Sequence, residues 1–153
     1  MKALELKVPP LVLGLALALA MWFAAKQLPS LAFTLPWRDG LAVTISAVGI
    51  LFLVAGLYEF QKARTTFNPM TPDAASSVVM SGVYRVTRNP MYLGFLFLLT
   101  GWAVFLSHPL PFLFLPVFVV YMNRFQISPE ERVLSAKFGE DYDQYTQRIR
   151  RWL

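Results

Sequence analysis

Residues 91–122 read MYLGFLFLLTGWAVFLSHPLPFLFLPVFVVYM, and this almost wholly apolar stretch decides the fold. The apolar run breaks only at Ser107-His108-Pro109, which predicts a tight turn between two helices. The first arm, residues 91–106, is slightly shorter than the roughly 20 residues that a membrane crossing needs. The second arm, residues 110–122, contains two prolines and would cover only about 20 Å at about 1.5 Å per residue. We therefore expect a helical hairpin whose second arm is kinked or extends toward Phe125.

The composition of the whole chain agrees with a membrane location. Of its 153 residues, 56% are hydrophobic and 15% are charged. Soluble domains are about 45–50% apolar and about 25% charged, so a soluble globular domain, a disordered chain and a typical nucleic-acid-binding protein are excluded. The chain has no cysteine and a single histidine, His108, which excludes disulfides, thiolate chemistry and a cysteine- or histidine-rich metal site.

Two further apolar segments precede the hairpin. Residues 8–25 and 41–58 are each long enough to span a membrane. The first segment could instead be a signal peptide, because it has a basic start and Ala18-x-Ala20, but its apolar run is long and lacks a clean cleavage context. The four segments predict an all-α integral membrane protein with one domain over residues 1–153 and a cytoplasmic tail at residues 128–153.

Basic residues are concentrated on one side of this four-span topology. Lys26 and Arg38 lie on the side opposite to both termini. Because basic loops remain in the cytoplasm, the charge asymmetry predicts cytoplasmic N and C termini, as in a protein of the bacterial inner membrane. The other twelve basic residues share the side of the termini: Lys2, Lys7, Lys62, Arg64, Arg85, Arg88, Arg124, Arg132, Lys137, Arg148, Arg150 and Arg151.

The segment GVYRVTRNPMYLG, residues 82–94, places two arginines and two tyrosines at a predicted helix start. Asn89 is a typical N-cap and Pro90 a typical first helical residue, so structure alone could explain the segment, with Arg85 and Arg88 reaching the membrane interface. A helix N-terminus also offers N–H groups and positive potential, which suit a carboxylate or another anion. Both interpretations remain open at this point.

A second cluster, Ser128-Pro129-Glu130-Glu131, has the pattern of a capping box. Ser128 and Glu131 would cap a helix that begins at Pro129, which leaves Glu130 without a structural role. Neighbouring helical residues point about 100° apart, so the two carboxylates cannot do the same task. One could cap the helix while the other faces a ligand.

Two further patterns concern packing. Tyr142, Tyr145, Ile149 and Trp152 fall on one helical face among arginines, which predicts an amphipathic helix at the membrane interface. Small residues recur on one face of the second and third spans, which favours close helix packing, with backbone approach to a ligand as the alternative. These small residues are Ser46, Gly49, Gly56, Gly94 and Gly101.

In combination, SGVYRVTRNPMYLGFLFLLTGWAVF and ISPEERVLSAKFGEDYDQYTQRIRRWL resemble the membrane methyltransferases that act on isoprenylcysteine carboxyl groups and on phospholipid amines. The resemblance covers about residues 58–153. It implies in-line methyl transfer from S-adenosylmethionine to a lipophilic or small membrane-partitioned acceptor at the cytoplasmic membrane face. By motif, it implies that the cofactor is bound by Tyr84, Arg88, Asn89, Pro90, Tyr92, Gly94, Glu130, Phe138, Tyr142 and Tyr145.

The resemblance says less about the acceptor than about the cofactor, because Asn89 stands where the family often has histidine and Arg64 where it often has glycine. An amine acceptor needs a base, which would be Glu130, Glu131 or water, whereas a carboxylate or thiolate needs only a positive clamp. The candidate catalytic residues are Glu130, Glu131 and Arg64, and no metal is expected. The alternatives are an NADPH-binding membrane reductase and a non-catalytic membrane interaction protein that binds no cofactor.

Overall fold

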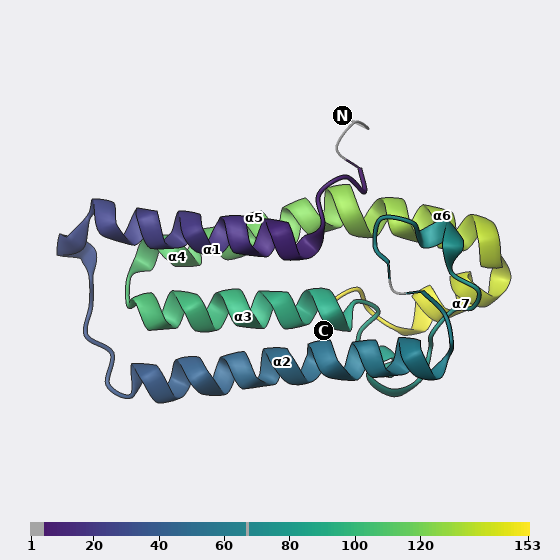
Figure 1. Ribbon diagram of the computed structural model, residues 1–153, viewed down its shortest axis with the longest axis horizontal. Coiled ribbons are helices and arrows are strands. Elements are labelled where there is room, and N and C mark those ends of the chain that lie inside the picture. Colours follow the sequence, from purple (N-terminus) through teal and green to yellow (C-terminus); the bar gives the residue numbers. More distant parts are fainter. Residues whose placement is uncertain (1–4, 67) are drawn as a thin grey trace.

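The computed structural model describes residues 5–66 and 68–153, so Lys2 lies outside the described residues (Figure 1). Within them every regular element is a helix, which confirms the all-α class. The α-helical and π-helical elements are α1 (Pro10–Gln27), α2 (Arg38–Lys62), α3 (Pro90–Leu106), α4 (Pro109–Phe112), α5 (Phe114–Tyr121), the π-helical turn η5 (Met122–Ile127), α6 (Ser128–Phe138) and α7 (Glu140–Arg148). Short 3-10 turns occur at η2 (Pro29–Leu31), η3 (Pro72–Ala74) and η4 (Gly82–Arg85).

Three helical stretches are long and apolar enough to cross a membrane: α1, α2 and the run Pro109–Phe138. α3 is also apolar but has only 17 residues. Many large apolar side chains point away from the protein, and Val43 and Leu51 on α2 are each 68% exposed. A soluble protein rarely exposes so extended an apolar surface, so this outer face suits lipid.

The chain runs back and forth along the long axis of the molecule (Figure 1). The α1–α2 connection and the α3–α4 turn lie at one end, while the start of α3, α6 and α7 lie at the other. The predicted hairpin turn is confirmed, because α3 ends at Leu106 and α4 begins at Pro109. Ser107 takes the left-handed conformation (φ 49°), and the His108 Nε2 atom lies 2.9 Å from the carbonyl oxygen of Leu28, which holds this turn against the end of α1.

The second arm of the hairpin extends far past Met122, the last residue of the predicted apolar arm. α4 and α5 continue through the wide turn of η5 into α6, so the helical run reaches Phe138. Ser128 has helical dihedral angles (φ −62°, ψ −40°), and no side-chain cap is formed at the start of α6. The predicted capping box is therefore wrong, because a continuous helix supplies partners for these N–H groups from its preceding turn.

α2 and α3 pack closely along their length, as the small residues predict. A Cβ atom at Gly49 would lie 2.7 Å from the carbonyl oxygen of Gly94, and a Cβ at Gly94 would lie equally close to the carbonyl oxygen of Gly49. Real Cβ atoms do not approach other atoms so closely, so only glycine fits at either position. The contact fixes the start of α3 against the middle of α2. It lies inside the bundle, near the end that holds the polar residues.

The predicted amphipathic tail helix is only partly correct. α7 contains Tyr142 and Tyr145, which are both buried, but it ends at Arg148, and Ile149 is extended (φ −116°, ψ 134°). Trp152 therefore does not continue the helical face. Its indole N–H instead donates to the Asn123 side chain at 3.1 Å. The tail folds back over the end of the bundle because its tyrosines and its last residues find partners there.

Candidate functional site

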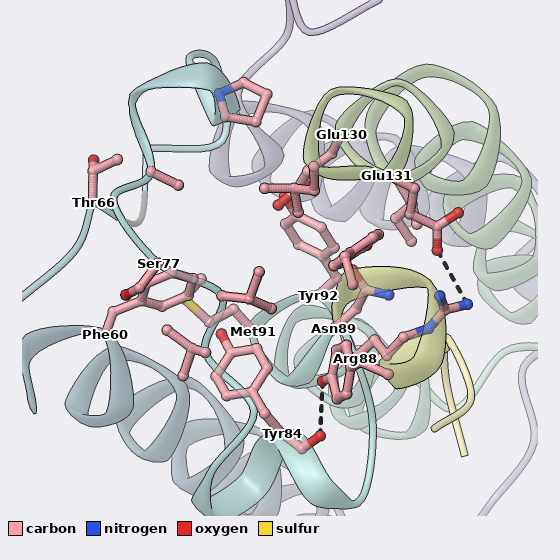
Figure 2. Close-up of a pocket in the computed structure, with 18 of the residues that line it drawn as sticks. Phe60, Thr66, Ser77, Tyr84, Arg88, Asn89, Met91, Tyr92, Glu130 and Glu131 are labelled. Carbon is pink, nitrogen blue, oxygen red and sulfur yellow. Dashed lines mark hydrogen bonds and ion pairs between the residues drawn. The ribbon is translucent and has the colours of Figure 1, made fainter. Parts of the chain in front are cut away.

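A pocket lies at the end of the bundle where α2 stops and α3 begins (Figure 2). Its walls come from α2, η4, α3, α6 and α7, and residues 68–79, here called the covering segment, close one side. The empty space between these walls measures about 790 Å³, which includes the open solvent at its mouth. Its aromatic, charged and amide side chains are Phe60, Asn68, Tyr84, Arg88, Asn89, Tyr92, Glu130, Glu131, Tyr142 and Tyr145.

Glu130 projects from α6 toward Tyr92 of α3, whose hydroxyl donates a 2.9 Å hydrogen bond to the Glu130 carboxylate. α6 carries charged residues in its first and last turns, so Glu130 lies past the apolar part of its helical run. Burial raises the pKa of Glu130 from 4.5 to about 7, and the hydrogen bond from Tyr92 opposes this rise. A carboxyl group with such a pKa exchanges protons readily near neutral pH, which is a common property of groups at functional sites.

Glu131, the next residue, points to the other side and is held by two arginines. Arg88 Nη2 lies 3.1 Å from Glu131 Oε1 (Figure 2). Arg151 Nε donates to the same oxygen at 3.0 Å. The Arg88 Nε atom is buried and has no hydrogen-bond partner among the described residues. A buried donor without a partner costs about 1–3 kcal/mol.

The last residues of the chain are fixed across the start of α3. The backbone N–H of Arg88 donates to the carbonyl of Arg150 at 2.9 Å. The Thr87 hydroxyl and the Asn89 side-chain amide both donate to the carbonyl of Arg151, at 2.9 and 3.0 Å. Asn89 forms no side-chain cap, although α3 begins at Pro90 as predicted. The tail therefore completes the pocket wall that contains Arg88.

Three tyrosines bring neutral hydroxyl groups to the pocket. Burial raises the pKa of Tyr84, Tyr142 and Tyr145 above the usual range. The Tyr145 hydroxyl donates to the carbonyl of Tyr84 at 2.8 Å, which ties α7 to η4. The Tyr84 ring extends into the pocket (Figure 2) and packs edge-on against Phe60 of α2. These hydroxyls remain protonated at physiological pH and can act as hydrogen-bond donors, while the rings offer apolar faces.

The structure brings most of the predicted site residues together. Tyr84, Arg88, Asn89, Tyr92, Glu130, Glu131, Tyr142 and Tyr145 all line the pocket. Four predicted residues do not appear among its described lining residues. Pro90 begins α3, Gly94 packs against α2, Phe138 ends α6, and Arg64 is exposed in a left-handed turn after α2 (φ 51°).

Sequence reasoning missed Phe60, the covering segment and Arg151. The prolines and serines of the covering segment predict irregular structure, and it contains only the short turn η3. Nothing in a local pattern indicates which distant residues an irregular segment covers. In the sequence Arg151 is only one of many basic residues, because its pairing with Glu131 spans 20 positions and depends on how the tail folds back.

Several known proteins are similar to this chain in sequence. A family model described as phospholipid methyltransferase matches residues 37–141. Protein-S-isoprenylcysteine O-methyltransferase B of Arabidopsis thaliana is 26% identical over 113 residues, which are 74% of this chain and 57% of that protein. The Mus musculus protein-S-isoprenylcysteine O-methyltransferase is 31% identical over 121 residues, which are 74% of this chain and 43% of that protein.

A relative named for a different activity is also similar. The Delta(14)-sterol reductase of Mus musculus is 27% identical over 134 residues, which cover 76% of this chain and 32% of the reductase. The chain thus spans only about a third to just over half of the length of these three relatives. No solved structure matches the chain significantly.

Proposed function

This chain belongs to the phospholipid methyltransferase family, and we propose that it transfers a methyl group from S-adenosylmethionine to a lipophilic acceptor at the cytoplasmic face of a membrane. The pocket at the end of the bundle would be the site of this reaction. The observation that carries the proposal is the lining of this pocket, which brings Arg88 together with Glu130 and the buried tyrosines. The buried Nε–H of Arg88 has no partner among the described residues.

The residues present fit this cofactor. S-adenosylmethionine has a carboxylate, an ammonium group, a sulfonium, a ribose diol and an adenine. The Arg88 Nε–H suits the carboxylate, since hydrogen bonds between charged groups are about twice as strong as neutral ones. Glu130 suits the ammonium group or the diol. The rings of Phe60, Tyr84 and Tyr142 suit the adenine and the sulfonium cation.

The bound cofactor would supply an electrophilic methyl group on a sulfonium. The protein would then need mainly to align the acceptor and exclude water, and alignment alone can provide about 7–11 kcal/mol. Glu130 could take the proton of an amine acceptor, because burial raises its pKa to about 7 and a base works best near the ambient pH. A carboxylate acceptor would need no base.

The apolar part of the lining supports a lipophilic acceptor. Met91 and Ile127 come from α3 and η5, which continue into the apolar body of the bundle, and Val79 and Leu134 add further apolar surface. A pocket that is polar at one side and apolar at the other can receive a water-soluble cofactor and a membrane-dissolved acceptor together. We propose that the headgroup of such an acceptor enters beside Met91 and Tyr92.

The orientation in the membrane forms part of the proposal. With α3 as a fourth crossing, the chain passes the membrane four times and both ends lie on one side. Of the described lysines and arginines, only Lys26 and Arg38 lie near the end with the α1–α2 connection, and the rest lie toward the pocket end (Figure 1). Because basic residues favour the cytoplasmic side, this distribution supports a cytoplasmic pocket.

A reductase function is less well supported by the charges of the pocket. NADPH carries several phosphate charges, which bind best where arginines and lysines are clustered. Among the described lining residues Arg88 is the only cation, and it is paired with Glu131, while Glu130 adds a second carboxyl group to the lining. A sulfonium cofactor, which is cationic overall, suits this balance better.

Calorimetric titration of the detergent-solubilised protein with S-adenosylhomocysteine and with NADPH tests the proposal. We expect the first ligand to bind and the second not to bind. Arg88→Lys keeps a positive charge near Glu131 but removes the Nε–H, and Glu130→Gln removes the carboxylate. Each change should weaken binding at least about tenfold, since a hydrogen bond to a charged group contributes about 1.5–3 kcal/mol.

The matched control is Glu140→Gln, because Glu140 is an exposed residue in the first turn of α7 and is not a described lining residue of the pocket. It should bind like the wild type. Failure of a folded wild-type protein to bind S-adenosylhomocysteine, or equal weakening by the control, would refute the proposal. Transfer of a labelled methyl group to fractions of a lipid extract would then identify the acceptor.

A further inference from the structure

Gln126 is a buried polar residue that the proposed reaction does not use. It lies in the π-helical turn η5, and only 2% of its surface is exposed. Its side-chain amide donates a 2.7 Å hydrogen bond to the carbonyl oxygen of Pro69. Single π turns are rare in helices and occur often at functional sites, and a buried amide has to be satisfied by hydrogen bonds. These features suggest that the position of Gln126 has a specific role.

On one side, Gln126 holds the covering segment. Pro69 lies near the start of that segment, and Asn68, Pro72 and Val79 of the same segment line the pocket. A second contact lies farther along, where the exposed Lys137 ammonium group donates to the carbonyl of Asp73 at 2.5 Å. The helical run Pro109–Phe138 therefore holds the covering segment at two points, one buried and one exposed.

On its other side, Gln126 is close to Glu130. The two residues are four positions apart, so their side chains lie on the same helical face. The polar side chain of Gln126 lowers the pKa of Glu130 and so opposes the effect of burial. The Tyr92 hydroxyl, which donates to Glu130 at 2.9 Å, completes this small polar network.

We propose that Gln126 is a positioning residue that couples the covering segment to Glu130. Its amide ties Pro69 over the pocket and at the same time orients the Glu130 carboxylate. The role of this coupling in ligand binding rests on the proposed function, whereas the link between Pro69, Gln126 and Glu130 holds for the protein without any ligand. The covering segment and the Glu130 carboxylate then take up their positions together.

A change in the titration of Glu130 would report on this link, because the other groups facing it behave differently. Tyr84 of η4, Tyr92 of α3 and Tyr142 of α7 all face Glu130, and burial keeps Tyr84 and Tyr142 protonated. Glu131 is paired with Arg88 and Arg151. Glu130 is therefore the group expected to change its charge near neutral pH.

The experiment follows the carboxyl ¹³C signal of Glu130 by NMR in ligand-free protein labelled at glutamate, with Glu130→Gln to assign the signal. Gln126→Leu keeps the approximate size of the side chain and removes the hydrogen bond to Pro69 together with the polar group beside Glu130. The titration midpoint of Glu130 should rise by about one pH unit, because a polar neighbour that favours its charged form is lost. Hydrogen exchange of residues 68–79 should become faster in the same variant.

Lys137→Ala is the matched control, because it releases the same segment at Asp73 without contacting Glu130. It should accelerate hydrogen exchange of the segment and leave the Glu130 midpoint unchanged. An unchanged midpoint in Gln126→Leu, or an equal shift in both variants, would overturn the proposal. If Gln126→Leu does not fold, Gln126→Asn replaces it, because the asparagine side chain is too short to reach both Pro69 and Glu130. The Glu130 midpoint and the hydrogen exchange of residues 68–79 are then measured in the same way.

The ligand-dependent part has a separate readout. At about pH 7, a rise of one unit in the midpoint lowers the charged fraction of Glu130 about fivefold, and affinity for S-adenosylhomocysteine should fall by about the same factor. A shifted midpoint in a protein whose wild type binds no S-adenosylhomocysteine would refute the proposed function and leave the coupling intact. A shifted midpoint with unchanged affinity would overturn the ligand-dependent part.

Discussion

Replacing Gly49 with alanine tests the packing that positions the site. The new Cβ would lie 2.7 Å from the carbonyl oxygen of Gly94, 3.0 Å from the Phe97 Cβ and 3.2 Å from the Leu98 nitrogen. These atoms belong to the backbone of α3 or lie next to it, so no change of side-chain rotamer relieves the clash. Since ordinary contact begins at about 3.4 Å, α2 and α3 have to move apart by roughly 0.7 Å.

The expected cost follows from two opposing effects. Overpacking a tight contact costs about 1–3 kcal/mol, and the backbone contacts here favour the upper end of that range. Alanine is about 1 kcal/mol better than glycine within a helix. We therefore expect Gly49→Ala to lower the free energy of unfolding by about 2 kcal/mol, a change of about 30-fold in the unfolding equilibrium.

Gly40→Ala is the control, because Gly40 lies in the same helix and a methyl group added there would have no atom within 4 Å. It should be as stable as the wild type or up to about 1 kcal/mol more stable. Reversible unfolding in mixed micelles, followed by circular dichroism, measures both variants. A Gly49→Ala protein with the wild-type midpoint, or a Gly40→Ala protein destabilised to the same extent, would refute the reasoning.

Two further predictions concern charge. The folded chain raises the pKa of Glu130 from 4.5 to about 7, so the folded state binds more protons than the unfolded state between these values, and stability should fall as pH rises through this range. Glu130→Gln should remove this slope and be more stable than the wild type at about pH 8 but similar at about pH 4, whereas parallel unfolding curves of the two proteins would contradict the raised pKa. A reporter fused after Leu153 should be active in the cytoplasm, and activity on the opposite side of the membrane would rule out the four-pass topology with cytoplasmic ends.

The helices and the hairpin turn could be predicted because their signals are local. An apolar run between polar breaks identifies a membrane helix from composition alone, and Ser107-His108-Pro109 marks a turn within the apolar stretch. Glycine spacing likewise predicted the close contact between α2 and α3. The element bounds moved by only a few residues, except where α5 continues into α6.

The errors arose where local signals compete with distant contacts. Ser128 has the neighbours of a helix cap, but the helix runs through it, and its hydroxyl faces the Arg151 guanidinium at 3.4 Å instead. Tyr145 and Ile149 share a helical spacing, but the chain straightens after Arg148 so that the carbonyls of Arg150 and Arg151 can meet the start of α3. No pattern within the tail itself contains this information.

The sequence predicted that Glu130 and Glu131 point in different directions, and the structure confirms this, but Glu131 pairs with two arginines and does not cap the helix. Because their directions differ by about 100°, Glu130 faces Tyr92 while Glu131 faces the two arginines. Arg88 uses its terminal nitrogen for Glu131, and its buried Nε has no partner among the described residues. Loss of activity in Arg88→Ala would therefore not distinguish a collapsed wall from a lost ligand contact. Arg88→Lys retains a positive charge opposite Glu131 and removes the Nε–H, so it separates these two roles better than alanine does.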